Sequence, residues 1–177
     1  MLNKKTVFET DWFTVESEDF DLPQLHGKPI YRINTPDSVT VIAFTEDKKL
    51  ILVKQFRAAS GIFTIELPSG SVDVNETREI AAARELYEET GYHCQKLEYV
   101  SQGRVMADRV NSNIFVFFGR NAIKDINFVS EEGIEVVLVS FTELKDIVHR
   151  GELKQLAGLG TLVLAKWILN PLELQEL

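Results

Sequence analysis

The order of its predicted elements indicates that this chain has an α/β fold, an α/β/α sandwich around a mixed β-sheet. Apolar runs with strand periodicity stand on both sides of one helical segment in the middle of the chain. From Phe141 onward the periodicity becomes helical. The 177 residues, 45% of them hydrophobic, suffice for one substantial core. Helices layered on a sheet suit this order of elements.

The predicted strands fall into two groups. Residues 6–8, 12–16 and 28–33 are expected to form a small N-terminal antiparallel sheet. The runs 39–44 and 50–55 flank a charged segment and predict a central hairpin. Further strands are expected at 63–67, 95–104, 113–119 and 136–140, and C-terminal helices at 142–150 and 154–169. We therefore divide the chain into N-terminal strands, residues 1–36, and a main domain, residues 37–177.

Residues 80–90 are expected to form the helix in the middle of the chain, because they contain no Gly, Pro or run of β-branched residues. Asn75 or Thr77 can cap its start, and Gly91 suits the left-handed position beyond its end. At about 100° per residue, one sector of this helix is apolar and the roughly opposite one is acidic. The apolar sector holds Ile80, Ala83, Leu86 and Tyr87, and the acidic one holds Glu85, Glu88 and Glu89.

We expect a positive charge to compensate the carboxylates of the acidic sector. Carboxylates three or four residues apart repel by about 0.2–0.5 kcal/mol per pair, and the C-terminal end of a helix disfavours negative charge. Oxygen ligands of this kind suit hard ions such as Mg²⁺. The alternative is a solvated helix face, in which Arg84 partly neutralises Glu88 at i+4.

The spacing of residues around this helix matches a known motif. Five residues separate Gly70 from Glu76, seven separate Glu76 from Arg84, and the sequence then reads Arg-Glu-Leu-Tyr-Glu-Glu-Thr-Gly-Tyr. This pattern resembles the complete Nudix box. Nudix enzymes split the diphosphate bond of a nucleoside diphosphate linked to another group X, with Mg²⁺ or Mn²⁺ as cofactor. The resemblance implies that the metal ligands are the Ser69 carbonyl, Glu85, Glu88 and Glu89, and that the turn at Gly70 leads into the metal-binding helix.

The residues that flank the box resemble one subgroup of the Nudix family. Gln55-Phe56-Arg57, followed by Glu66-Leu67-Pro68-Ser69-Gly70, is similar to the ADP-ribose and nucleoside-diphosphate-sugar pyrophosphatases over roughly residues 7–169. That subgroup implies hydrolysis of ADP-ribose to AMP and ribose 5-phosphate, by a homodimer built through the N-terminal strands. Residues 103–109 lack the proline that relatives often carry there. The identity of X therefore stays open, with another nucleotide sugar, a dinucleoside polyphosphate or another nucleotide as alternatives.

Several residues outside the box are candidates for substrate binding or catalysis. Arg57 can present a bidentate fork to phosphate, although it can also be a surface residue at a strand end. Glu66 and Arg109 are further substrate-binding candidates, and Glu66 can equally be a satisfied structural carboxylate. The resemblance implies a general base on the loop before the last strand, where Glu131 and Glu132 precede Gly133. Glu88 is the candidate if the base belongs to the box, and an acidic surface turn is the alternative for the loop.

Composition and charge limit the partners of the protein. A net charge of −8 without a basic stripe argues against non-specific binding to nucleic acid. The single cysteine, Cys94, excludes an intrachain disulfide, and no run of about 18 apolar residues suggests a membrane span. We expect a cytoplasmic protein. Two other classes stay open, a non-hydrolytic nucleotide-binding regulator of the same fold and an isomerase that uses a cysteine and a glutamate.

Overall fold

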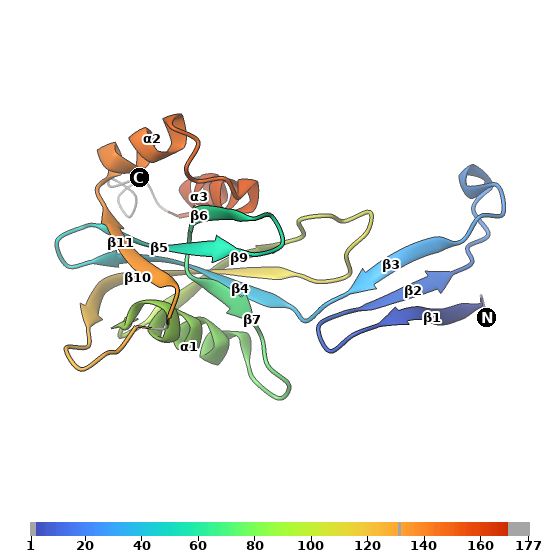
Figure 1. Ribbon diagram of the computed structural model, residues 1–177, viewed down its shortest axis with the longest axis horizontal. Helices are drawn as coiled ribbons and strands as arrows, with labels where there is room; N and C mark the ends of the chain where they lie inside the picture. Colours follow the sequence, from blue (N-terminus) through green and yellow to red (C-terminus); the bar gives the residue numbers. More distant parts are fainter. Residues whose placement is uncertain (1–2, 131, 170–177) are drawn as a thin grey trace.

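The N-terminal residues form a three-stranded antiparallel sheet, as the sequence predicts. The computed structural model describes residues 3–130 and 132–169. Strands β1 (Lys4–Glu9), β2 (Thr14–Glu18) and β3 (Ile30–Asn34) pair in that order, and a short 3₁₀ helix, η1 (Pro23–Leu25), precedes β3. This sheet extends away from the rest of the molecule (Figure 1). At its base, the Ile33 N–H donates to the Arg109 carbonyl (2.8 Å) and the Asn111 N–H donates to the Ile33 carbonyl (2.9 Å).

The second sheet is mixed and provides the frame of the main domain. Its strand order is β11-β5-β4-β10-β8, with β6 paired to β5, β7 to β4 and β9 to β10. Strand β10 runs parallel to β4, whereas its other pairings are antiparallel. The strands are β4 (Ser38–Thr45), β5 (Leu50–Arg57), β6 (Ile62–Glu66), β7 (Ser69–Ser71), β8 (Tyr92–His93), β9 (Leu97–Gly103), β10 (Ile114–Lys124) and β11 (Ile134–Val139).

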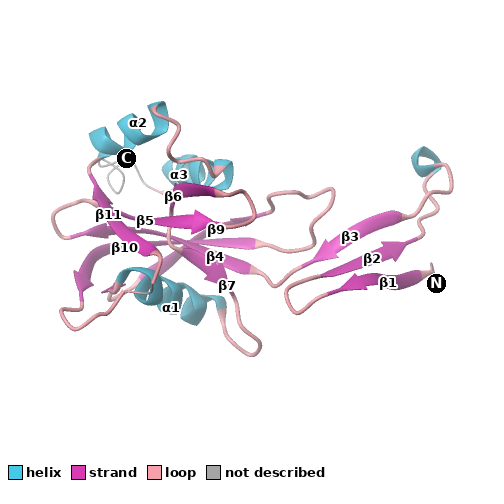
Figure 2. Ribbon diagram, viewed as in Figure 1, coloured by secondary structure: helices cyan, strands magenta, loops and turns pink. Residues whose placement is uncertain are grey.

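Helices cover both faces of this sheet, which confirms the predicted α/β/α sandwich. Helix α1 (Arg78–Thr90) lies on one face, and α2 (Phe141–His149) and α3 (Leu156–Ile168) lie on the other (Figure 2). Successive residues of β4 point to opposite faces of the sheet, where two hydrophobic cores lie. Val41 packs in the core with Ala81 of α1, and Ile42 packs in the core with Leu144 of α2. Among the helices that the structure describes, none has the length and apolar character that crossing a membrane requires.

The ends of α1 follow the sequence signals. The Ile80 N–H donates to the Thr77 hydroxyl (3.3 Å), so Thr77 caps the helix start. Gly91 takes φ +68° at the other end, and its N–H donates to the Tyr87 carbonyl (2.7 Å).

The predicted apolar face of α1 is confirmed at Leu86, which is buried, and wrong at its other three positions. Ile80 is 58% exposed, and Ala83 and Tyr87 are also exposed. The buried side consists of Ala81, Ala82, Leu86, Glu89 and Thr90. Small alanine side chains let a helix lie close to a sheet, and this close packing decides the buried side more than the large apolar side chains do. One of the three acidic residues, Glu89, is therefore buried instead of lying on the solvated face.

Two local predictions also differ from the structure. The segment at Ser69 and Gly70 is not a turn but the short strand β7, which pairs with β4 through Val39 and Gly70. The predicted hairpin of β4 and β5 is short, because the only paired residues in its described register are Phe44 and Leu50. Beyond that point β5 pairs with β6 and β11, while β4 pairs with β7 and β10.

The corrected face of α1 predicts the effect of two truncations on the same helix. Leu86→Ala removes a side chain with no exposed surface, and should lower the free energy of unfolding by about 2–5 kcal/mol. Ile80→Ala is the matched control and should change it by about 1 kcal/mol or less, because Ile80 faces solvent. Urea denaturation followed by circular dichroism measures both. Equal losses for the two variants would contradict the assigned face.

Candidate active site

Strand β7 brings its backbone against the last turns of α1. The Ser69 N–H donates to Glu89 Oε2 at 2.9 Å. A Cβ atom added at Gly70 would collide with the carboxyl group of Glu85. Gly70 does not take a positive φ, so glycine is required here by the close approach of Glu85. The predicted metal ligands Ser69, Glu85 and Glu89 therefore meet at the contact between β7 and α1.

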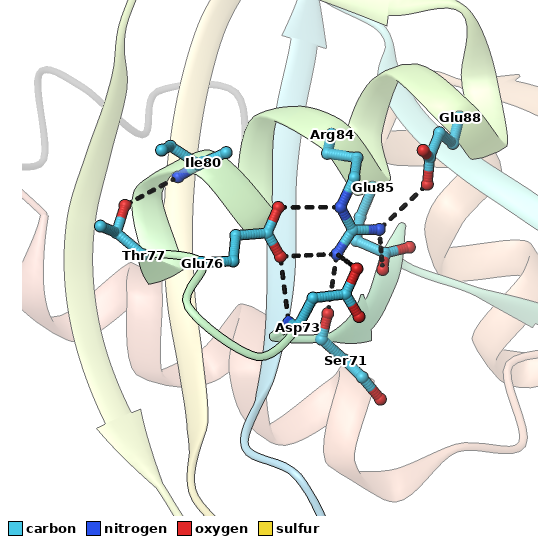
Figure 3. Close-up of polar contacts among 8 residues, drawn as sticks. All are labelled: Ser71, Asp73, Glu76, Thr77, Ile80, Arg84, Glu85 and Glu88. Atoms are coloured by element: carbon cyan, nitrogen blue, oxygen red, sulfur yellow. Dashed lines mark hydrogen bonds and ion pairs between the residues drawn. The ribbon is translucent and has the colours of Figure 1, made fainter.

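Arg84 neutralises the remaining carboxylates of the box (Figure 3). Its guanidinium donates to Glu76 Oε1 and Oε2 (both 2.9 Å), Glu85 Oε1 (2.7 Å), Glu88 Oε2 (3.0 Å) and the Ser71 carbonyl (2.9 Å). Its hydrogen bonds hold the pKa of Glu76 at about 2 and raise the pKa of Arg84 itself. The predicted i,i+4 contact with Glu88 is confirmed and is one part of this larger network.

Glu85 and Glu89 lie in environments that disfavour their charge. Burial raises the pKa of Glu89 to about 7, although the hydrogen bond from Ser69 acts in the opposite direction. Burial also raises the pKa of Glu85, and Arg84 offsets part of this effect. A cation bound between these groups would favour the ionised form of both.

The donor set fits a hard divalent cation. Glu85, Glu88, Glu89 and the Ser69 carbonyl offer only oxygen atoms, which Mg²⁺ and Mn²⁺ prefer. The space between Gly70 and the Glu85 carboxyl, which a Cβ would fill, admits this carboxylate next to the backbone of β7. Within residues 3–130 and 132–169, no three acidic, His or Cys side chains already stand in a metal-ligating cluster. Arg84 donates to Glu85 and Glu88, so a cation that binds these carboxylates would compete with Arg84 for their oxygens.

A cavity of about 480 Å³ opens beside β7. Its lining includes Ser69 and Gly70 of β7, Arg57 at the end of β5, and Gln155 and Leu156 at the start of α3. The cavity therefore places Arg57 and the β7 residues that contact Glu85 and Glu89 on one lining, and its volume suits a small-molecule ligand.

Arg57 and Glu66 form a bidentate ion pair. Arg57 Nε donates to Glu66 Oε1 (2.9 Å) and Nη2 donates to Oε2 (2.5 Å). Burial alone would raise the pKa of Glu66, but hydrogen bonds from Arg57 and Thr64 and the charge of Arg57 hold it below its ordinary value. Glu66 has no exposed surface. This geometry favours the structural alternative for Glu66 over direct contact with a substrate.

The other predicted residues lie apart from this cavity's lining. Arg109 is on the exposed loop between β9 and β10, where its Nη1 donates to the Asp108 carbonyl (3.0 Å). Glu132 is exposed in the turn before β11, and Glu131 lies outside the described residues. Their role in catalysis stays a prediction.

The start of the loop that carries Glu132 is fixed to α1. Tyr87 Oη donates to Asp125 Oδ2 (2.9 Å), and the Tyr87 ring meets Phe128 edge-on, with centroids 5.5 Å apart. A cavity of about 380 Å³ lies between Glu88 and residues 127–129. The loop therefore starts next to the box helix.

Sequence reasoning missed Gln155. Its side chain donates to Glu66 Oε2 at 2.8 Å across 89 positions of sequence. No motif marks this glutamine, which falls inside a predicted helix, so only the tertiary structure reveals the contact.

The raised pKa of Glu89 predicts a pH effect on the metal-free protein. Between pH 4.5 and about 7, folded Glu89 keeps a proton that the unfolded chain loses, so the free energy of unfolding falls as the pH rises through this window. Glu89→Gln should remove this part of the slope, whereas the exposed control Glu135→Gln should retain it. Urea denaturation in EDTA at both ends of the window measures the difference. An unchanged slope in Glu89→Gln would contradict the assignment.

Comparison with known proteins agrees with this geometry. Residues 34–157 match the family model of the NUDIX domain. The chain is 31% identical over 153 residues to the ADP-ribose pyrophosphatase of Bacillus subtilis (strain 168), covering 85% of this chain and 79% of that protein. It is 26% identical over 160 residues to the GDP-mannose pyrophosphatase of Yersinia pestis (strain Pestoides F), covering 81% and 80%.

The fold is shared with a solved structure. The crystal structure of an ADP compounds hydrolase superposes with a TM-score of 0.77 at 20% identity, covering 94% of this chain and 91% of the other. At this identity the likeness concerns the fold. The family model covers well over half of the chain and includes the whole box. Together with the acidic site at β7 and α1, these matches show that the chain belongs to the Nudix family and is a pyrophosphatase of that family.

Proposed function

We propose that this protein is a cytoplasmic homodimer that hydrolyses ADP-ribose to AMP and ribose 5-phosphate, with Mg²⁺ or Mn²⁺ as cofactor. The observation that carries the proposal is the meeting of Glu85, Glu89 and the β7 backbone beside a cavity whose wall holds Arg57. The similarity to an ADP-ribose pyrophosphatase supports the choice of substrate.

Each group has a distinct task in this proposal. The Ser69 carbonyl, Glu85, Glu88 and Glu89 would hold the cation, which supplies Lewis acidity toward the phosphoryl oxygens and lowers the pKa of water. Arg57 binds a phosphate oxygen of the diphosphate from the cavity wall. Water attacks one phosphorus of the diphosphate, and the bond from that phosphorus to the bridging oxygen breaks. The other phosphate leaves with the bridging oxygen, and Glu132 or Glu131 accepts the proton of the water. Glu88 is the alternative base.

Other candidate functions receive unequal support. The similarity to a GDP-mannose pyrophosphatase makes other nucleotide sugars the second substrate class. A non-hydrolytic regulator has no need for three metal-competent carboxylates. An isomerase with Cys94 as a catalytic acid or base is disfavoured, because burial raises the pKa of this thiol to about 11.

The metal site can be tested by neutralising its carboxylates. Purified protein with Mg²⁺ or Mn²⁺ should hydrolyse ADP-ribose, with release of AMP, faster than it hydrolyses GDP-mannose or dinucleoside polyphosphates. EDTA, which removes the cation, should abolish hydrolysis. Glu88→Gln and Glu89→Gln should each lower turnover by at least about 100-fold, because they remove charge with little change in size. Glu79→Gln, in the exposed first turn of the same helix, is the control. Activity within a few-fold of wild type in both site variants would contradict the assignment.

The general base is tested on the loop before β11. Glu132→Gln or Glu131→Gln should reduce kcat by about 10²–10⁴-fold with little change in the Mg²⁺ concentration required for half-maximal activity. Glu135→Gln is the matched control, because Glu135 is exposed on β11 and pairs with Lys54. Near-normal kcat in both single variants and the double variant would move the role to Glu88 or Glu89.

The dimer is proposed to form through residues 1–36. The N-terminal segment exposes large apolar side chains: Trp12, between β1 and β2, is 82% accessible, and Tyr31 on β3 is 55% accessible. A small isolated sheet is marginally stable in water. Light scattering should give a dimeric mass at micromolar concentration. Trp12→Glu should shift the mass toward the monomer, whereas Trp167→Glu on α3, also exposed, should leave it unchanged. A monomeric wild type would refute the proposal.

A further inference from the structure

The carboxylate of Glu66 accepts hydrogen bonds from side chains of three segments, and we call this group of contacts the Glu66 junction. The donors are Arg57 at the end of β5, the Thr64 hydroxyl on β6, and Gln155 Nε2 just before α3 (2.8 Å). The residue is completely buried. A buried carboxylate requires donors for its lone pairs, so these three side chains are held in a fixed relation to one another.

The pairing with Glu66 occupies only one edge of the Arg57 guanidinium. Nε and Nη2 face the two carboxylate oxygens. The second edge of the guanidinium, formed by Nη1 and the other Nη2 hydrogen, is a further fork that can donate two parallel hydrogen bonds. Arg57 lines the cavity beside β7, and its side chain is 40% exposed. Among the described residues, the Arg57 guanidinium has hydrogen bonds to Glu66 alone, so one fork is anchored in the protein and the other is left for a ligand of the cavity.

Gln155 uses its side chain for this junction instead of for its own helix. It occupies the N-cap position of α3 without making a side-chain capping bond there. It lines the same cavity as Arg57. The neighbouring main-chain contact from the Ile65 N–H to the Glu152 carbonyl (3.3 Å) ties the same two regions together. The start of α3 is thus coupled to the orientation of Arg57.

We propose that Gln155 is a positioning residue for substrate binding: through Glu66 it fixes the Arg57 guanidinium so that the second fork faces the diphosphate of the substrate. This inference rests on the proposed function. Gln155 Nε2 and Arg57 Nη2 both donate to Glu66 Oε2, so Gln155 takes the place on this oxygen at which a second N–H of Arg57 would otherwise bind. A neutral amide meets this need without repelling Arg57, as a cation would, or Glu66, as an anion would.

Kinetics distinguish this role from a purely structural one. Gln155→Leu keeps much of the side-chain volume and removes the donor. It should raise KM for ADP-ribose about tenfold and leave kcat within about twofold, because Arg57 binds phosphate charge present in substrate and transition state alike. Thr64→Val, which removes a donor to the same carboxylate from β6, should act in the same direction. Lys154→Ala, next to Gln155 on the exposed surface, is the control.

A double-mutant cycle and a spectroscopic measurement complete the test. In an Arg57→Ala background, Gln155→Leu should raise KM no further, since the residue on which it acts is gone. In nuclear magnetic resonance spectra of the substrate-free protein, the Arg57 Nε–H should exchange with water faster in Gln155→Leu than in wild type. Additive effects on KM, or unchanged exchange in Gln155→Leu and Thr64→Val, would overturn the inference. If wild type cleaves no ADP-ribose, the proposed function fails, and the exchange measurement still decides the positioning role.

Discussion

The contact between strand β7 and the last turns of α1 is the interaction on which the site depends. It exists because Gly70 has no Cβ, so the Glu85 carboxyl can lie against the strand, and because the Ser69 N–H binds Glu89. The central sheet fixes both elements in place. Strand β7 pairs with β4, and α1 packs on the same sheet through Ala81 and Ala82. The fold therefore determines the separation between the carboxylates and the backbone oxygens near them.

The carboxylates of α1 are stabilised in two different ways. Glu88, together with Glu76, receives hydrogen bonds from Arg84, so its charge is compensated inside the protein. Glu89 is buried without a cationic hydrogen-bond partner among its contacts in the described part of the chain, and Ser69 is its donor. Burial raises the pKa of Glu85, as it does that of Glu89, and Glu85 also receives a hydrogen bond from Arg84, as Glu88 does. A divalent cation would therefore gain most from the two carboxylates that β7 partly covers, whereas Arg84 must release Glu88 if that residue is to join them.

Features encoded locally in the sequence were predictable, and those decided by distant contacts were not. The caps of α1 at Thr77 and Gly91, the spacing of the box and the Arg84–Glu88 contact all lie within about two dozen consecutive residues, and the structure confirms them. The buried side of α1 was predicted correctly at Leu86 alone, because the position of the sheet selects Ala81 and Ala82 instead of Ile80 and Tyr87. The contact of Gln155 with Glu66 spans 89 positions, and a single sequence contains no local signal for it.

The parallel pairing of β4 with β10 has a consequence for the order of folding. Ser38 pairs opposite Ile114, so the chain between them, which includes the whole of α1, must be enclosed in one long crossover. Closing such a loop costs chain entropy before its contacts can form, and pairings of this kind slow the folding of a domain. The hairpins and the helix can form early from local contacts. The acidic site, which needs α1 on the finished sheet, is therefore expected to be assembled in one of the last steps of folding, together with the closure of the central strand pair.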